Sequence, residues 1–181
     1  ARSSLRRSAR QLFGISPTAR LGDPIRVTCG TGVFEKRGFL GAAVSKPLQE
    51  IFLPPLVVPS SEKLPDELAG WLSQQSRKIV YVSFGTLLCP DARILRSLAK
   101  GLKNAGVAAL WVLPVEQRVS LNAEDLSPEN FFFADFLPQT ALLFSGRVSC
   151  FVTHAGANSI HESLTAGVPM LCIPIIYDQH Y

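Results

Sequence analysis

The chain has 181 residues, a length that suits one domain or slightly more with a sizeable hydrophobic core. Hydrophobic residues make up 47% and charged residues 18%, a balance that excludes intrinsically disordered and coiled-coil proteins. The longest stretch without a charged side chain covers residues 163–177, and a glycine and two prolines interrupt it. Because this stretch is too short and too broken to cross a bilayer, the sequence predicts no membrane span.

The net charge of +4 is unevenly distributed, since residues 1–37 carry +6 and the remainder carries −2. A basic end is a feature of proteins that bind nucleic acids or anionic lipids. No aromatic residue lies among Arg2, Arg6, Arg7 and Arg10, however, and base stacking needs such residues. We therefore expect no nucleic-acid partner.

The four cysteines are scattered and form no C-x-x-C pair; they are Cys29, Cys89, Cys150 and Cys172. This usage favours a reduced, cytoplasmic protein. The chain begins without an initiator methionine and stops directly after an apolar run. We interpret both ends as cut from a longer protein.

The first 53 residues differ in composition from the rest. They predict a basic helix over 4–13, closed by a glycine, and short strand and turn pieces around 25–28. Residues 54–64 are rich in proline and serine and predict a stiff linker.

From residue 65 onward the predicted strands and helices alternate. Helices are expected at 66–74, 90–104, 137–144 and 157–166, and strands at 78–83, 107–113, 131–136, 148–153 and 169–173. This order predicts an α/β fold with a Rossmann-like, doubly wound parallel sheet. Such sheets bind ligands at the carboxyl ends of their strands, so these ends are the candidate site.

The densest signal is the small-residue turn that follows the strand at 148–153 and opens a helix. Free backbone N–H groups and the positive helix end would meet there, which suits a phosphate or diphosphate, and His154 could donate a ring N–H to it. The alternative is a helix capped by Asn158 or Ser159 with no ligand.

Glu162 also has two interpretations. It lies three residues after Ser159, the spacing of a capping box. Its carboxylate could instead accept hydrogen bonds from the two hydroxyls of a ribose. The local sequence supports both equally.

Other strand ends carry further polar candidates. Gln139 could contact a base edge while Phe136 stacks on the base, although aromatic residues at strand ends are usually core. Thr86 could bind phosphate or cap a turn. Asp178 and Gln179 suit sugar hydroxyls or a solvated loop.

The sequence disfavours metal sites and two classes of enzyme mechanism. His154, His161 and His180 have no partner at metal-ligand spacing, so we expect no metal site. No G-x-S-x-G or G-x-x-x-x-G-K motif is present, which disfavours acyl-enzyme and P-loop NTPase mechanisms.

Taken together, these segments resemble the signature of the family-one UDP-glycosyltransferases, whose members pair two Rossmann-like domains in the GT-B fold. The matching runs are FLPQ at 136–139, FVTHAGANSIHESLTAGVP at 151–169 and PIIYDQ at 174–179, with ELAGWL at 67–72 and VYVSFGT at 80–86 upstream. The resemblance covers residues 65–181. It implies a donor-binding domain there, truncated at its C-terminus, a linker at 54–64 and a remnant of the acceptor domain at 1–53.

The resemblance also implies a UDP-sugar site made of Ser83, Gly85, Thr86, Phe136, Gln139, His154, Gly156, Asn158, Ser159, Glu162, Asp178 and Gln179. In the family, the positions of Phe136 and Gln139 contact uracil and that of Glu162 contacts ribose. The positions of Thr86, His154, Asn158 and Ser159 surround the diphosphate, and those of Asp178 and Gln179 hold the sugar. Plant members usually carry Trp at the position of Phe136, and many members carry Gly or Cys at that of Ala155.

The implied function is transfer of a hexose, with glucose favoured by Gln179, from a UDP-sugar to a hydroxyl of a small-molecule acceptor. UDP-sugar is a co-substrate, so no cofactor is expected, and the family's general base belongs to the acceptor domain. The alternative is a non-catalytic donor-binding subunit of a two-chain enzyme. A nicotinamide-dependent oxidoreductase is disfavoured because G-x-G-x-x-G is missing after the first strand of the alternating region.

Overall fold

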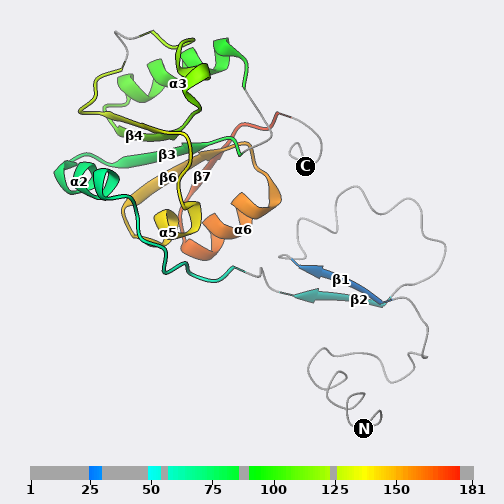
Figure 1. Cartoon of the computed structure of the whole chain (residues 1–181). Helices are drawn as coiled ribbons and strands as arrows, with labels where there is room; N and C mark the ends of the chain where they lie inside the picture. The colour runs from blue at the N-terminus through cyan, green and yellow to red at the C-terminus, as the bar shows by residue number, and fades with distance from the viewer. Residues whose placement is uncertain (1–24, 30–48, 54–56, 86–89, 123–125, 176–181) are drawn as a thin grey trace. The chain divides into compact units, whose positions relative to one another are not determined.

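A computed structural model describes residues 25–29, 49–53, 57–85, 90–122, 126–175 of the chain (Figure 1). The chain divides into two units, one of residues 1–56 with Tyr181 and one of residues 57–180. In the first unit, β1 (Ile25–Cys29) pairs in parallel with β2 (Gln49–Leu53). The sequence predicted β1 but not β2, and the helix predicted at 4–13 lies outside the described residues.

The second unit is built on a five-stranded parallel sheet of order β5-β4-β3-β6-β7. Its strands are β3 (Ile79–Ser83), β4 (Ala108–Val112), β5 (Phe131–Ala134), β6 (Val148–Thr153) and β7 (Met170–Cys172). Its helices are α2 (Asp66–Gln74), α3 (Ala92–Asn104), α4 (Val115–Arg118), α5 (Gln139–Phe144) and α6 (Ala157–Ala166).

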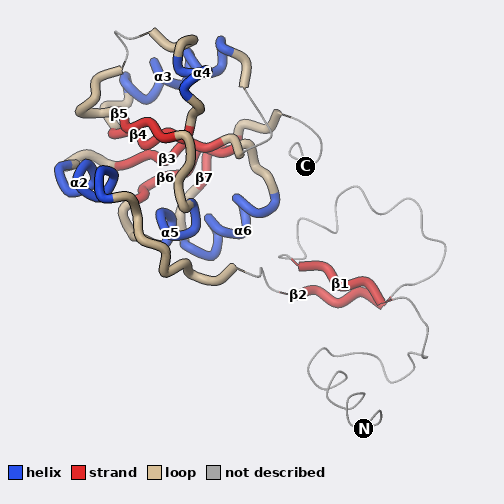
Figure 2. Tube along the Cα trace, viewed as in Figure 1, coloured by secondary structure: helices blue, strands red, loops and turns tan. Residues whose placement is uncertain are grey.

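Helices cover both faces of this sheet, with α3 and α4 on one side and α5 and α6 on the other (Figure 2). Alternate residues of each strand point to opposite faces, which produces two separate hydrophobic cores. Tyr81 and Phe151 belong to the core shared with α2 and α5, whereas Val82 and Trp111 belong to the core under α3. The fold is therefore the predicted doubly wound α/β arrangement, and it has three layers.

The order of the strands reverses at β3. The chain moves from β3 outward through β4 to β5, and then returns to place β6 on the other side of β3. In doubly wound sheets this switch point opens a crevice at the carboxyl ends of the two strands. The segments after β3 and β6, residues 84–85 and 154–156, lie at this position.

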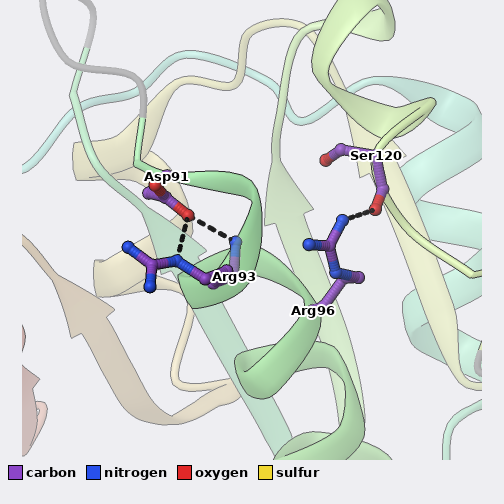
Figure 3. Close-up of polar contacts among 4 residues, drawn as sticks. All are labelled: Asp91, Arg93, Arg96 and Ser120. Atoms are coloured by element: carbon purple, nitrogen blue, oxygen red, sulfur yellow. Dashed lines mark hydrogen bonds and ion pairs between the residues drawn. The ribbon is translucent and has the colours of Figure 1, made fainter.

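The amino end of α3 shows how local chemistry fixes a helix start (Figure 3). The Asp91 carboxylate accepts a hydrogen bond of 2.7 Å from the backbone N–H of Arg93 and one of 3.3 Å from its Nε. The backbone hydrogen bond, followed by the Arg93 side chain, lowers the pKa of this carboxyl group. One turn later, Arg96 donates to the carbonyl oxygen of Ser120 at 3.3 Å, which ties α3 to the segment after α4.

In the second unit most predicted elements are confirmed, and the main differences are one strand end and one additional helix. The strand expected at 131–136 ends at Ala134, so Asp135 and Phe136 leave the sheet. The short helix α4 was not predicted. Arg118 stabilises this region because it donates to the Leu113 carbonyl at 2.7 Å and to the Asp135 carboxylate at 2.5 Å.

Candidate functional site

A cavity of about 880 Å³ lies at the carboxyl ends of the central strands. Nine of the twelve predicted site residues line it: Ser83, Gly85, Phe136, Gln139, His154, Gly156, Asn158, Ser159 and Glu162. They come from the last residue of β3 and from the segments that follow β3, β5 and β6, so the fold gathers residues that are up to 79 positions apart in the sequence. The other three, Thr86, Asp178 and Gln179, lie outside the described residues.

His154 sits between two glycines. A Cβ atom at Gly156 would lie 2.4 Å from His154 Nε2, and one at Gly85 would lie 3.0 Å from His154 Cε1. Gly85 also has a φ of 76°, which L side chains rarely adopt. Both glycines are therefore required for the imidazole to occupy this place at the cavity wall.

The turn from β6 into α6 presents backbone groups toward the same place. Ala155 has a φ of 66°, in the left-handed region, and the N-cap is Gly156, with no side chain capping the helix. The first helical hydrogen bond runs from the Ile160 N–H to the Gly156 carbonyl at 3.0 Å. The preceding N–H groups of the first turn, with the positive end of the helix dipole, are thus available to an anion.

This geometry overturns two of the alternatives raised from the sequence. Asn158 and Ser159 lie within the first turn of α6 and not at its N-cap. Glu162, five residues after Ala157, is too far along the helix to complete a capping box.

Glu162 instead belongs to a hydrogen-bonded cluster with α5. Its Oε2 accepts a hydrogen bond of 2.5 Å from Gln139 Nε2, and its Oε1 accepts one of 3.0 Å from the Thr140 hydroxyl. Gln139 Nε2 also donates to Ser159 Oγ at 3.3 Å. The two carboxylate oxygens are therefore held in a fixed orientation at the cavity edge, and each keeps accepting capacity for another donor.

Tyr81 extends this cluster into the sheet. Its hydroxyl group donates to Gln139 Oε1 at 3.2 Å, and its ring stacks on Phe151 with a centroid distance of 4.8 Å. Burial raises the pKa of the Tyr81 hydroxyl far above its usual value; a hydrogen bond from Ser83 lowers it in part, and the Glu162 charge raises it further. The hydroxyl therefore remains protonated and can act as a donor.

Phe136 is the large apolar side chain at the cavity rim, and 71% of its surface is exposed. The next residue, Leu137, is buried in the core with α5. An exposed ring beside this cavity is available for contact with a planar ligand.

The cavity also includes residues that the sequence interpretation missed. Its lining includes Tyr81, Pro114, Gln117 and Asp135. Thr140 is not part of the lining, but its hydroxyl donates a hydrogen bond to Glu162. Pro114 and Gln117 follow β4, so the strand-end rule, applied to that strand, would have found them. Tyr81 lies two residues before Ser83, on the same face of β3, which is a signal available in the sequence.

The described part of the chain contains neither a membrane-spanning helix nor a cluster of metal ligands. No helix there is long and apolar enough to cross a membrane. Within the same residues, no three His, Cys, Asp or Glu side chains are grouped as metal ligands.

Comparison with known proteins agrees with this geometry. The sequence profile of the family described as "UDP-glucoronosyl and UDP-glucosyl transferase" matches residues 55–181. A myricetin 3-O-rhamnosyltransferase, UGT77B2, from Crocosmia x crocosmiiflora is 36% identical over 137 residues, which cover 74% of this chain and 29% of that protein. An anthocyanidin 3-O-glucosyltransferase from Zea mays is 39% identical over 120 residues, covering 64% of this chain and 26% of the relative.

Solved structures show the same relationship. A UDP-glucose:anthocyanidin 3-O-glucosyltransferase, solved in complex with UDP, superimposes with a TM-score of 0.65 at 32% identity over 73% of this chain and 31% of that one. Medicago truncatula UGT71G1, complexed with UDP-glucose, has a TM-score of 0.65 at 28% identity over 75% of this chain and 32% of its own. The chain thus spans less than a third of the length of these relatives.

Three of the segments that carry the sequence resemblance, at 80–86, 136–139 and 151–169, contribute residues to the cavity, and the profile covers most of the chain. The described residues between 57 and 175 have the Rossmann-like fold of the C-terminal part of a GT-B glycosyltransferase. The chain belongs to the family of UDP-glucoronosyl and UDP-glucosyl transferases.

Proposed function

We propose that the protein transfers a hexose, with glucose the favoured sugar, from a UDP-sugar to a hydroxyl group of a small-molecule acceptor, and that the cavity binds the UDP-sugar donor. The observation that carries this proposal is the position of Glu162. Its carboxylate, which Gln139 and Thr140 hold in a fixed orientation, lies on α6, one turn after the uncapped amino end of this helix. A diol-binding group and an anion-binding group at this separation suit a nucleoside diphosphate.

The carboxylate suits the ribose. Gln139 and Thr140 each use part of the accepting capacity of one oxygen of Glu162. The two oxygens can each accept one more hydrogen bond, which matches the two neighbouring hydroxyl groups of a ribose.

The start of α6 suits the diphosphate. Ser159 Oγ already accepts from Gln139, so the hydroxyl proton of Ser159 is left to donate elsewhere, toward the cavity. His154, the backbone N–H groups of the first helical turn and the helix dipole add positive potential. We expect these groups to stabilise the UDP leaving group as the anomeric bond breaks, without a cofactor.

We propose a different role for Gln139 from the one that the resemblance implies. The resemblance implies that Gln139 contacts the base, but Tyr81, Ser159 and Glu162 already engage both ends of its amide. We therefore propose that Gln139 acts on the ribose side and that the exposed ring of Phe136 carries the base contact. Thr86 as a diphosphate ligand and Asp178 with Gln179 as sugar ligands remain predictions.

The names of the relatives support the reaction class. Relatives act as anthocyanidin 3-O-glucosyltransferase and myricetin 3-O-rhamnosyltransferase, so UDP-sugar donors and hydroxyl acceptors are the expected substrates. The mechanism would be direct displacement at the anomeric carbon, assisted by a general base. We propose that this base lies outside the donor site and that the 181-residue chain alone binds the donor without transferring sugar.

The test is calorimetric titration of the chain with UDP, ADP and NAD. The proposal predicts that UDP binds most tightly. Equal or tighter binding of NAD would overturn it, because the cavity would then be a dinucleotide site. Turnover of UDP-glucose by the 181-residue chain with an acceptor panel would show that the base lies within it.

A further inference from the structure

A chain of hydrogen bonds connects the sheet to the carboxylate of Glu162. The Tyr81 hydroxyl contacts Gln139 Oε1 at 3.2 Å, and Gln139 Nε2 contacts Glu162 Oε2 at 2.5 Å. Tyr81 is only 1% exposed, and its ring is held against Phe151 with an interplanar angle of 18°. The hydroxyl group is thus anchored in the rigid centre of the sheet, whereas Gln139 and Glu162 belong to two different helices.

The direction of each hydrogen bond in this chain is determined. A carboxylate only accepts, so the amide nitrogen of Gln139 must face Glu162. The amide oxygen then faces Tyr81, which must donate. Burial raises the pKa of Tyr81, so the phenol keeps the proton that it donates to Gln139. The Tyr81 hydroxyl thus adds a contact at the oxygen end of the amide, which holds the amide in the orientation that the Glu162 carboxylate requires.

We propose that Tyr81 is a positioning residue that sets the selectivity of the site for ribose over deoxyribose. Its hydroxyl group holds the Gln139 amide in one orientation, and the amide in turn aims the Glu162 carboxylate at the diol. This inference rests on the proposed function, since it assumes that Glu162 accepts from the ribose hydroxyls.

The variant that tests this role is Tyr81→Phe, which keeps the ring and its stacking on Phe151 and removes only the hydroxyl group. The matched control is Ser163→Ala. Ser163 is a fully buried residue of α6 whose hydroxyl donates to the Val168 carbonyl at 2.8 Å, away from the cavity. Each variant loses one buried neutral hydrogen bond, so a general loss of stability should be similar in both.

The measurement is the affinity of the 181-residue chain for UDP and for 2′-deoxy-UDP, with thermal unfolding of each variant. The parent chain should prefer UDP. In Tyr81→Phe we expect UDP to bind about two- to tenfold more weakly, as for loss of one neutral hydrogen bond, and 2′-deoxy-UDP to change less. The preference for UDP should therefore shrink in Tyr81→Phe and remain unchanged in Ser163→Ala.

A second substitution keeps the test decisive if Tyr81→Phe does not fold. Placing 3-fluorotyrosine at position 81 retains the shape and makes the phenol a stronger donor, so the preference for UDP should rise. An unchanged preference in this variant, or a parallel loss of both affinities in Tyr81→Phe, would overturn the role of Tyr81. A parent chain that binds neither nucleotide would instead refute the proposed function.

Discussion

The imidazole of His154 lies so close to Gly156 that a Cβ atom at position 156 would be 2.4 Å from its Nε2. The backbone of Gly156 itself is unremarkable, with φ of −64° and ψ of 144°, which any residue can adopt. The requirement for glycine at this N-cap therefore comes from the histidine and not from the chain conformation.

This relationship predicts the effect of Gly156→Ala. The new methyl group should push the His154 ring out of its place at the cavity wall and weaken UDP binding by about tenfold, the loss expected for a charge-assisted hydrogen bond. The fold should be retained. Calorimetry with UDP measures the first effect and thermal unfolding the second.

The controls separate the histidine from the backbone. In a His154→Ala background, Gly156→Ala should have no further effect on affinity, because the two changes remove the same contact. Gly101→Ala, within α3 where a Cβ atom meets nothing within 4 Å, should stabilise the chain and leave binding unchanged. Additive losses in the double variant would contradict this explanation.

Glu162→Ala should weaken UDP binding more than Ser159→Ala does. Hydrogen bonds to a charged group contribute about 1.5 to 3 kcal/mol, against about 1 kcal/mol for a neutral pair, so the carboxylate should account for tenfold or more in affinity. Isothermal titration of both variants provides the comparison. If Glu162→Ala lowered the unfolding temperature and left UDP affinity unchanged, Glu162 would serve only the packing of α5 on α6.

The elements that the sequence predicted well are those with a clear pattern and clear ends. Residues 148–153 form β6 and residues 157–166 form α6, as expected, because an apolar run is followed by a small-residue turn and then by a helical stretch. The strand ending at Phe136 was predicted too long. β propensity alone did not reveal that Asp135 binds Arg118 and that Phe136 turns outward.

The sequence predicted the residues of the candidate site but not the hydrogen bonds between their side chains. Strand ends and helix starts are local signals; they indicated His154 and Glu162 as candidates, and both residues line one cavity. The contact between Tyr81 and Gln139 joins residues 58 positions apart, and that between Gln139 and Glu162 joins residues 23 apart. Such contacts depend on how α5 and α6 pack on the sheet, which no local pattern encodes.

Asp91 predicts a pH dependence of stability. Its pKa is lowered in the folded chain by the hydrogen bond from the Arg93 backbone and by the Arg93 side chain. A lowered folded pKa means that the carboxylate stabilises the fold above its unfolded pKa, and that this contribution is lost as the pH falls through the folded pKa. Asp91→Ala should therefore unfold at a lower temperature than the parent chain near neutral pH, with the difference shrinking in acid.

Asp91→Asn is the matched variant for this measurement. Its amide oxygen can still accept a hydrogen bond from the Arg93 N–H, but the amide does not titrate. The stabilisation by this cap should therefore not depend on pH. The difference in unfolding temperature between Asp91→Asn and the parent chain should change with pH, because the parent carboxylate titrates. Thermal unfolding across the acid range compares the three chains. A difference between the parent chain and Asp91→Ala that did not shrink in acid would be inconsistent with the role of the charged carboxylate.

Phe136 tests the base-binding side of the site. Its ring is 71% exposed at the cavity rim, and stacking of a base on an aromatic ring contributes about 1 to 3 kcal/mol. Phe136→Ala should weaken UDP about tenfold, and Phe136→Trp, with the larger ring usual in plant members, should bind UDP at least as tightly as the parent chain. Val119→Ala, at a side chain that is 85% exposed and outside the cavity lining, should leave the affinity unchanged. Ribose 5-phosphate is the control ligand, because it lacks a base. Its affinity should be the same in all four chains. A loss of affinity for ribose 5-phosphate in Phe136→Ala would mean that the ring supports the cavity wall and does not stack on uracil.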